Sequence, residues 1–215
     1  MVPRIVITGA PGSGKTKLIE RLKAEPLLDG FVYLPEAARQ LLTERPELRG
    51  KWSQFHREIY ALQTSRETAA SGKPLITDRG TVDAYAFHPE TLSEVGTSPE
   101  QEYRRYSLVI QLGTAASIAT REWKTDDIRR ESREEAMEIE KAITGAWQGH
   151  PNYRFVPAAM QIDDKYTALW RLIRESLTAD QTVKQATNQA VNQAAKQVTK
   201  MVTKQSVDES EAETS

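Results

Sequence analysis

The sequence predicts an α/β fold of three layers, in which helices cover both faces of a parallel sheet. Short apolar segments alternate with segments of helical periodicity along the chain, and this alternation is typical of βαβ units. The apolar segments are continuous rather than alternating, as in strands that are buried on both faces. With 215 residues, 39% of them hydrophobic, the chain is long enough for one main domain with a sizeable core.

Five strands are predicted, each short and bounded by residues that interrupt a strand. They occupy residues 4–8, 31–34, 74–77, 107–112 and 153–157. The first is β-branched and is closed by glycine, and Pro35 stops the second. The third runs directly into an Asp-Arg-Gly turn. We therefore expect a parallel sheet of five strands.

Helices are predicted between these strands, where apolar residues recur three or four positions apart. They occupy residues 15–23, 36–42, 54–70, 133–147 and 164–177. The first carries Leu18, Ile19 and Leu22 on one face. The fourth is heavily charged, and the last is amphipathic and closes the domain.

The chain changes character after about residue 178. Residues 178–206 are repetitive in Gln, Thr, Lys, Val and Ala, and the last residues are mostly acidic or Ser and Thr. Such a segment buries little apolar area. We expect a catalytic domain at residues 1–177 and a loosely helical or disordered tail at 178–215, with self-association through the tail as the alternative.

Composition excludes several classes of function. The formal net charge is -1, and this balance of acids and bases gives no electrostatic footprint for a nucleic acid, so no nucleic-acid partner is expected. There is no cysteine, which excludes disulfides and thiolate metal sites. Neither a signal peptide nor an apolar run of membrane-spanning length is recognised, so a soluble cytoplasmic protein is expected. We expect Trp52, Trp147 and Trp170 to pack in the core or at its edges.

A phosphate-binding loop follows the first strand. It fits the pattern G-x-x-x-x-G-K-[ST] with Gly9, Ala10, Pro11, Gly12, Ser13, Gly14, Lys15 and Thr16. Its glycines let successive backbone N–H groups turn toward the phosphates of a nucleotide, and the following helix adds its N-terminal dipole. Lys15 would reach the β- and γ-phosphates, and the Thr16 hydroxyl would bind Mg²⁺.

A second acid is needed to hold Mg²⁺ beside such a loop. Asp78 follows the third strand, at the edge of the sheet where ligands bind, and Arg79 beside it would stabilise charge on a transferring phosphoryl group. The alternative is a surface turn. Glu36, after the second strand, is either a general base for an attacking hydroxyl or an acid that favours a helix N-terminus.

An arginine-rich segment at residues 121–133 follows the fourth strand. A lid there would close over the phosphates and exclude water. Because acids nearly match the bases, a solvated and salt-bridged helix face is the alternative.

Together these segments resemble the AAA-like P-loop proteins related to the ribosylnicotinamide kinase domain, within the nucleoside and nucleotide kinases. The resemblance spans roughly residues 4–175 and rests on the loop, on Pro35-Glu36-Ala37-Ala38-Arg39, on Gln63 with Glu67, on Asp78-Arg79-Gly80 with Asp83, and on Trp123, Asp126 and Arg129. It implies a three-layer P-loop NTPase fold with a five-stranded sheet and a short lid.

The resemblance also implies roles for individual residues. Glu36 would be the general base, and Asp78 and Arg79 would serve Mg²⁺ and the phosphates. Arg129 and Arg133 of the lid would touch the donor, while Gln63 and Asp83 would face the acceptor.

The sequence therefore predicts a kinase that moves the γ-phosphate of ATP to a hydroxyl of a nucleoside-like or other small acceptor. The alternative is a nucleotide-binding regulator, an ATPase or GTPase switch without such an acceptor. GTP remains an alternative donor, although the absence of an Asn-Lys-x-Asp tetrapeptide favours adenine.

Overall fold

The computed structural model of the chain describes residues 2–120, 123, 131–179, 182, 185, 187, 189 and 193. The chain forms two compact units, Met1–Leu172 and Ile173–Ser215. Arg129 and most of the tail lie outside the described residues, so the tail's conformation and a domain boundary after residue 177 stay predictions. No helix in the described part of the chain is long and apolar enough to cross a membrane.

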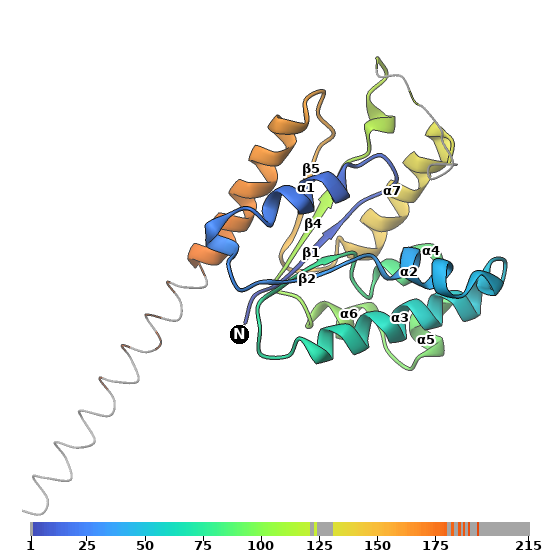
Figure 1. The fold of residues 1–215 in the computed structure, drawn as a ribbon, viewed down its shortest axis with the longest axis horizontal. Coiled ribbons are helices and arrows are strands. Elements are labelled where there is room, and N and C mark those ends of the chain that lie inside the picture. Colours follow the sequence, from blue (N-terminus) through green and yellow to red (C-terminus); the bar gives the residue numbers. More distant parts are fainter. Residues whose placement is uncertain are drawn as a thin grey trace, which may run out of the picture. The chain divides into compact units, whose positions relative to one another are not determined.

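A five-stranded sheet forms the centre of the first unit (Figure 1). Its strands are β1 (Arg4–Thr8), β2 (Val32–Leu34), β3 (Leu75–Asp78), β4 (Leu108–Leu112) and β5 (Tyr153–Val156). They lie in the order β2-β3-β1-β4-β5, and every neighbouring pair is parallel. The predicted strands and the parallel sheet are confirmed.

Helices cover both faces of this sheet, as predicted. The helices are α1 (Lys15–Leu22), α2 (Ala37–Glu44), α3 (Trp52–Ala69), α4 (Asp83–Phe87), α5 (Glu90–Glu94), α6 (Pro99–Tyr103) and α7 (Arg133–Trp147). Residues 162–179 are also helical. No helix was expected at α4, α5 or α6, because five residues are too few to show a period of 3.6. A capping box formed by Ser98 and Gln101 begins α6.

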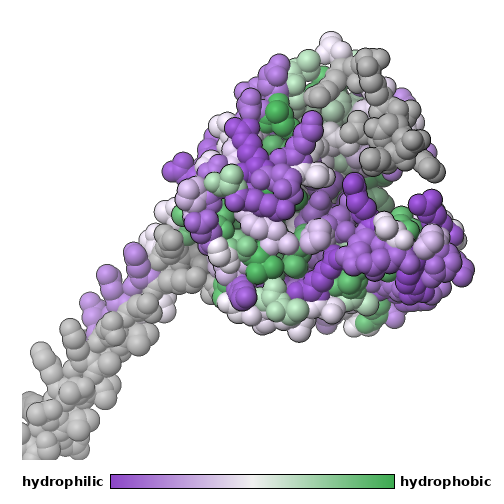
Figure 2. Space-filling model, viewed as in Figure 1, coloured by the Kyte–Doolittle hydropathy of each residue, from purple (hydrophilic) through white to green (hydrophobic). Residues whose placement is uncertain are grey.

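The core on the α7 side of the sheet is built around Trp147, which is fully buried. Its ring packs with Val6, Val109 and Ile143. Trp52, in contrast, is 58% exposed and lies at the edge of a second cluster, where its ring packs edge-to-face against the buried Phe55. Trp52 begins α3 and also lines a surface cavity. Figure 2 shows polar residues over most of one face of the molecule, with smaller apolar groups between them.

The strand register brings the predicted site residues to one edge of the sheet. Ile7 of β1 pairs with Asp78 of β3. The phosphate loop, which follows β1, and Asp78, which ends β3, therefore lie at the same edge of the sheet. β2 pairs with β3 through Leu34 and Thr77, two residues before Glu36. Ligands of parallel α/β sheets bind at this carboxyl edge.

Candidate functional site

The loop at residues 9–16 leads from β1 directly into the N-terminus of α1. Gly14 is the N-cap and supplies no side-chain cap, and the first turn holds no acidic residue. The first N–H groups of a helix have no partner within the helix. This end of α1 therefore offers backbone donors and a favourable dipole to an anion.

Outward contacts of the loop carbonyls hold the loop in shape. The Thr114 hydroxyl donates to the carbonyl of Pro11 over 2.5 Å. Nζ of Lys165 donates to the carbonyl of Ser13 over 2.7 Å and also to that of Gly113. Because these carbonyls are held by the surrounding protein, the loop is fixed before any ligand arrives.

Lys15 lies at the centre of the candidate phosphate site. Its Nζ donates to the carbonyl of Gly9 over 2.7 Å. Burial and then the nearby charge of Arg79 lower the pKa of Lys15 to about 8, while Asp78 and Glu36 oppose the shift. An anionic ligand would compensate this buried cation.

Asp78 and Thr16 line the same cavity of about 430 Å³. Oδ1 of Asp78 is buried and has no hydrogen-bond partner among the described residues. Burial raises the pKa of Asp78 to about 6, although Lys15 opposes this shift. A buried carboxylate oxygen without a donor and a neighbouring hydroxyl are oxygen ligands that fit Mg²⁺.

The remaining ligands of such an ion would not come from a dense acidic cluster. Within the described ranges, no group of three or more His, Asp or Glu residues is arranged to hold a metal. Mg²⁺ in phosphotransfer sites commonly takes one or two protein ligands and fills its shell with phosphate oxygens and water. Thr16 and Asp78 would thus suffice as the protein's contribution to such a site.

Arg79 joins the two other acids of the site. Its Nε donates to Glu36 over 2.9 Å, and its Nη1 donates to Asp83 over 3.2 Å. Burial would lower the pKa of Arg79, but the two carboxylates raise it well above its usual range. Burial likewise would raise the pKa of Glu36, but Arg79 and Lys15 hold it below its ordinary value. Glu36 is therefore ionised.

The backbone of Arg79 is in a left-handed conformation with φ of 71°, which is uncommon for a residue with a side chain. Its N–H donates to the carbonyl of Ile7 over 3.0 Å. Its carbonyl accepts from Thr77 Oγ1 over 2.7 Å and from Gln63 Nε2 over 3.4 Å. These contacts hold the strained turn and direct the guanidinium toward the site.

Gln63 and Asp83, expected to face an acceptor, are both almost fully buried. Nε2 of Gln63 also donates to Thr77 and Glu67. Asp83 accepts from Gly80 N over 2.8 Å, from the Thr8 hydroxyl and from the Trp147 indole. Asp83 also lines a cavity, described below. Their roles toward an acceptor stay predictions.

The described part of the predicted lid lies close to the phosphate loop. Trp123 Nε1 donates to the carbonyl of Glu131 over 3.0 Å, and its ring lies near Gly12. Arg133 donates to the carbonyls of Ala116 and Ile118. Arg129 lies outside the described residues, and donor contacts of Arg133 stay a prediction.

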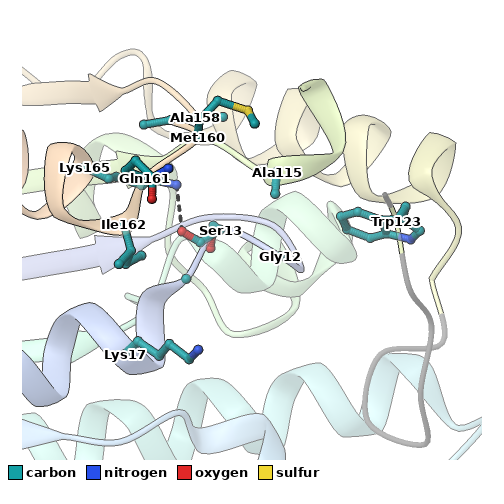
Figure 3. A pocket seen from close by; sticks show the side chains of 12 residues that line it. Gly12, Ser13, Lys17, Ala115, Trp123, Ala158, Met160, Gln161, Ile162 and Lys165 are labelled. Atoms are coloured by element: carbon teal, nitrogen blue, oxygen red, sulfur yellow. Dashed lines mark hydrogen bonds between the residues drawn. The ribbon is translucent and has the colours of Figure 1, made fainter. Parts of the chain in front are cut away.

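Besides the cavity of Thr16 and Asp78, the described residues line three further cavities around the loop. The largest of them, about 580 Å³, follows residues 10–17 and reaches Glu36 and Arg79. A second, of about 330 Å³, lies between Trp123 and residues 158–162 (Figure 3). A third, of about 280 Å³, is lined by aromatic residues of α3 and α4 and also reaches Glu36 and Arg79.

Sequence reasoning did not identify Lys165 or Thr114 as site residues. Lys165 lies 152 positions from Ser13 along the chain, and Thr114 does not belong to a recognisable motif. A lysine on the inner face of an amphipathic helix was the signal that could have drawn attention to Lys165, because an unpaired lysine is rarely buried.

Comparison with known proteins agrees with this geometry. The sequence model of a family described as AAA domain matches residues 4–165, from β1 to the lysine that holds the phosphate loop. No curated protein matches the chain. The match covers well over half of the 215 residues and includes the whole phosphate loop. The chain therefore belongs to the AAA domain family and is a P-loop nucleotide-binding protein.

Proposed function

We propose that this chain is a kinase that transfers the γ-phosphate of ATP to a hydroxyl of a small acceptor. One observation carries the proposal. The cavity along the phosphate loop and the aromatic cavity share part of their lining, namely Pro11, Glu36, Ala38, Leu42, Arg79 and Glu131. A donor phosphate in the first cavity and a hydroxyl in the second would meet at Glu36 and Arg79.

The donor nucleotide would be held from two sides. Its phosphates would lie over residues 9–16, where the N-terminus of α1 and Lys15 supply positive charge. Its base would occupy the cavity between Trp123 and Ile162, which lie on opposite sides of Gly12 and Ser13 in Figure 3. Aromatic and aliphatic walls of this kind suit the flat face of a base.

The transfer step would place each residue in a defined role. Glu36 accepts the proton of the acceptor hydroxyl. The hydroxyl oxygen forms a bond to the γ-phosphorus, and the bond between the γ-phosphorus and the β–γ bridging oxygen breaks, so that ADP leaves. Lys15 and Arg79 stabilise the negative charge on the phosphoryl oxygens. Mg²⁺ bound at Thr16 and Asp78 would neutralise phosphate charge.

The ion pair between Glu36 and Arg79 has a consequence for the base. In the unliganded protein Arg79 lowers the pKa of Glu36, which makes the carboxylate a weak base. A γ-phosphate that attracted the Arg79 guanidinium would weaken this pair and raise the pKa of Glu36. The base would then be strongest when the donor is bound.

The test measures ATP consumption with a panel of nucleosides and other small hydroxyl compounds. Wild type is compared with Glu36→Gln and with Glu44→Gln, a control at the exposed end of the same helix. The proposal predicts that one compound stimulates turnover and that only Glu36→Gln abolishes the stimulation. Tight nucleotide binding without stimulation by any compound would instead favour a nucleotide-dependent regulator.

A further inference from the structure

Glu67, near the C-terminal end of α3, carries a fully buried carboxylate that has no part in the transfer step described above. Its two oxygens have different partners. Oε2 accepts from the guanidinium groups of Arg4 and Arg105, the latter over 2.8 Å. Oε1 accepts from the amide of Gln63 over 2.9 Å and from the hydroxyl of Tyr106 over 2.7 Å. Because two cations compensate the buried charge, Oε1 is left to orient the neutral groups around it.

The Gln63 amide carries this orientation to the start of the turn at residues 79–81. A carboxylate only accepts hydrogen bonds, so the Nε2 side of the amide must face Glu67. The same Nε2 lies 2.7 Å from Thr77 Oγ1 and 3.4 Å from the carbonyl of Arg79. Since Thr77 accepts from Nε2, its hydroxyl donates its single proton to the Arg79 carbonyl, over 2.7 Å. Both side-chain donors to this carbonyl therefore depend on how Glu67 orients Gln63.

The Tyr106 hydroxyl carries the same orientation to the end of the turn. Burial, together with the charge of Glu67, raises the pKa of Tyr106 well above its usual range, so the hydroxyl keeps its proton and donates it to Glu67. Its oxygen accepts from the N–H of Thr81 over 2.9 Å. These side chains are all buried, so water does not readily replace a lost partner. One carboxylate thus holds the turn at both ends.

The turn needs this support because Arg79 has a left-handed backbone with φ of 71°, a conformation that costs free energy in a residue with a side chain. The same turn bears the guanidinium that pairs with Glu36 and Asp83. A rotation of the turn would move this guanidinium away from the place proposed for the γ-phosphate. A misplacement of about 1 Å can cost roughly 100-fold in rate.

We propose that Glu67 is a positioning residue for phosphoryl transfer, which holds the turn at residues 79–81 so that Arg79 points at the transferring phosphate. Glu67 acts through Gln63 and Tyr106 and touches no substrate. The inference rests on the proposed kinase function and adds to it a residue that lies behind the site.

Glu67→Gln in the full chain tests this role at nearly constant volume. The charged guanidinium groups should keep the remaining side-chain oxygen of the variant, so its NH₂ group faces Nε2 of Gln63. The Gln63 amide must then turn over, and the Arg79 carbonyl loses its donors. With the compound that stimulates wild type, kcat should fall by about 10- to 100-fold, while KM for ATP and for the acceptor changes by less than about twofold.

Glu102→Gln is the matched control, because Glu102 is also a buried carboxylate at 4% exposure. It accepts from Tyr60 and from Thr97, each over 2.9 Å, and pairs with Arg105 at 3.5 Å. These partners lie outside the turn at residues 79–81. Both variants should lower Tm, since each perturbs a buried polar network. Only Glu67→Gln should change kcat by more than about twofold.

The Nε–H group of Arg79 provides a readout that needs no acceptor. Its bond to Glu36 should give a slowly exchanging signal in proton–nitrogen NMR spectra, identified by its loss in Arg79→Lys. Glu67→Gln should shift or broaden this signal, and Glu102→Gln should not. Tyr106→Phe removes the hydroxyl and keeps the ring, and it should also shift the signal. It decides the question if Glu67→Gln does not fold.

The outcomes separate this inference from the proposed function. A changed Arg79 signal with a reduced kcat supports the inference. An unchanged signal overturns it, whatever happens to kcat, and so does a changed signal with an unchanged kcat. If wild type phosphorylates no hydroxyl compound, the kinase function falls, while the Arg79 signal still shows whether Glu67 orders the turn.

Discussion

Arg79 donates from Nε to a carboxylate oxygen of Glu36 over 2.9 Å, and the two residues lie 43 positions apart in the chain. The contact links the end of β3 to the start of α2 at the point where the phosphate cavity meets the aromatic cavity. Since Arg79 also pairs with Asp83, one guanidinium neutralises two largely buried carboxylates. Both stability and activity should depend on its fork-shaped geometry.

Arg79→Lys should lower the free energy of unfolding by about 1–3 kcal/mol. An ammonium keeps the charge but cannot bond to two carboxylates in the same directions, and an under-compensated buried acid is costly. Urea denaturation measures the change. Arg57→Lys is the control, because its pair with Glu94 is more exposed and should change stability by less than about 0.5 kcal/mol. Equal losses in the two variants would contradict the role given to Arg79.

The central strands β1, β3 and β4 were predictable because they are largely buried and are therefore continuous apolar runs. All five begin within one residue of the predicted positions, and the phosphate loop was recognisable from its glycines and its Lys-Thr pair. The order of the strands was not predictable, because nothing in a single strand specifies its neighbour. That order brings Asp78 beside Ile7, so the strand pairing was needed to place this proposed metal ligand.

Other parts of the site depend on contacts between distant residues. The Arg79 pairs and the bond from Lys165 to the Ser13 carbonyl have no local signature, because any arginine or lysine could equally lie on the surface. The prediction that Gln63 and Asp83 face an acceptor rested only on the family resemblance. The structure adds internal partners for both side chains, which no spacing rule specifies.

Mg²⁺ binding should weaken as the pH falls below about 6. The pKa of Asp78 is raised to about 6, so protons compete with the metal for this carboxylate below that pH. The Mg²⁺ concentration that gives half-maximal nucleotide binding should rise toward tenfold per pH unit. Asp78→Asn removes this contribution but retains the titration of the nucleotide phosphate. If the half-maximal Mg²⁺ concentration rose equally steeply with falling pH in wild type and in Asp78→Asn, the assignment of Asp78 would be contradicted.

The same pKa shift makes a prediction for stability without metal. The pKa of Asp78 in the folded protein exceeds the ordinary value of 3.8, so the folded state binds a proton more readily than the unfolded state. Stability from this group is therefore present below about pH 4 and is lost as the pH rises through 6. Asp78→Asn should raise Tm at pH 8 and leave it nearly unchanged at pH 4.

Nucleotide binding at pH 8 should be accompanied by proton uptake. The pKa of Lys15 in the free protein is about 8, so roughly half of the molecules lack this proton at pH 8. Phosphate anions favour the charged lysine, and roughly half a proton should be taken up per nucleotide. Calorimetry in two buffers of different ionisation enthalpy measures it. Lys51→Met, which replaces an exposed lysine, should retain the uptake.

Gln63→Leu distinguishes an internal role of Gln63 from contact with an acceptor. The amide donates to Thr77 over 2.7 Å and to Glu67 over 2.9 Å, so its loss should lower the free energy of unfolding by about 1–3 kcal/mol. KM for the acceptor should change by no more than about twofold. A large rise in KM with unchanged stability would show instead that Gln63 contacts the acceptor.

Gly12→Ala should weaken nucleotide binding by about tenfold or more. Gly12 has φ of 76°, and a Cβ there would lie 2.8 Å from the Trp123 ring, which lines the cavity proposed for the base. Gly30 has φ of 83° and open space around it, so Gly30→Ala introduces the backbone strain alone, about 1–2 kcal/mol. Both variants should lose that stability, but only Gly12→Ala should lose affinity for a non-hydrolysable ATP analogue in calorimetry. Equal affinity in the two variants would place the base elsewhere.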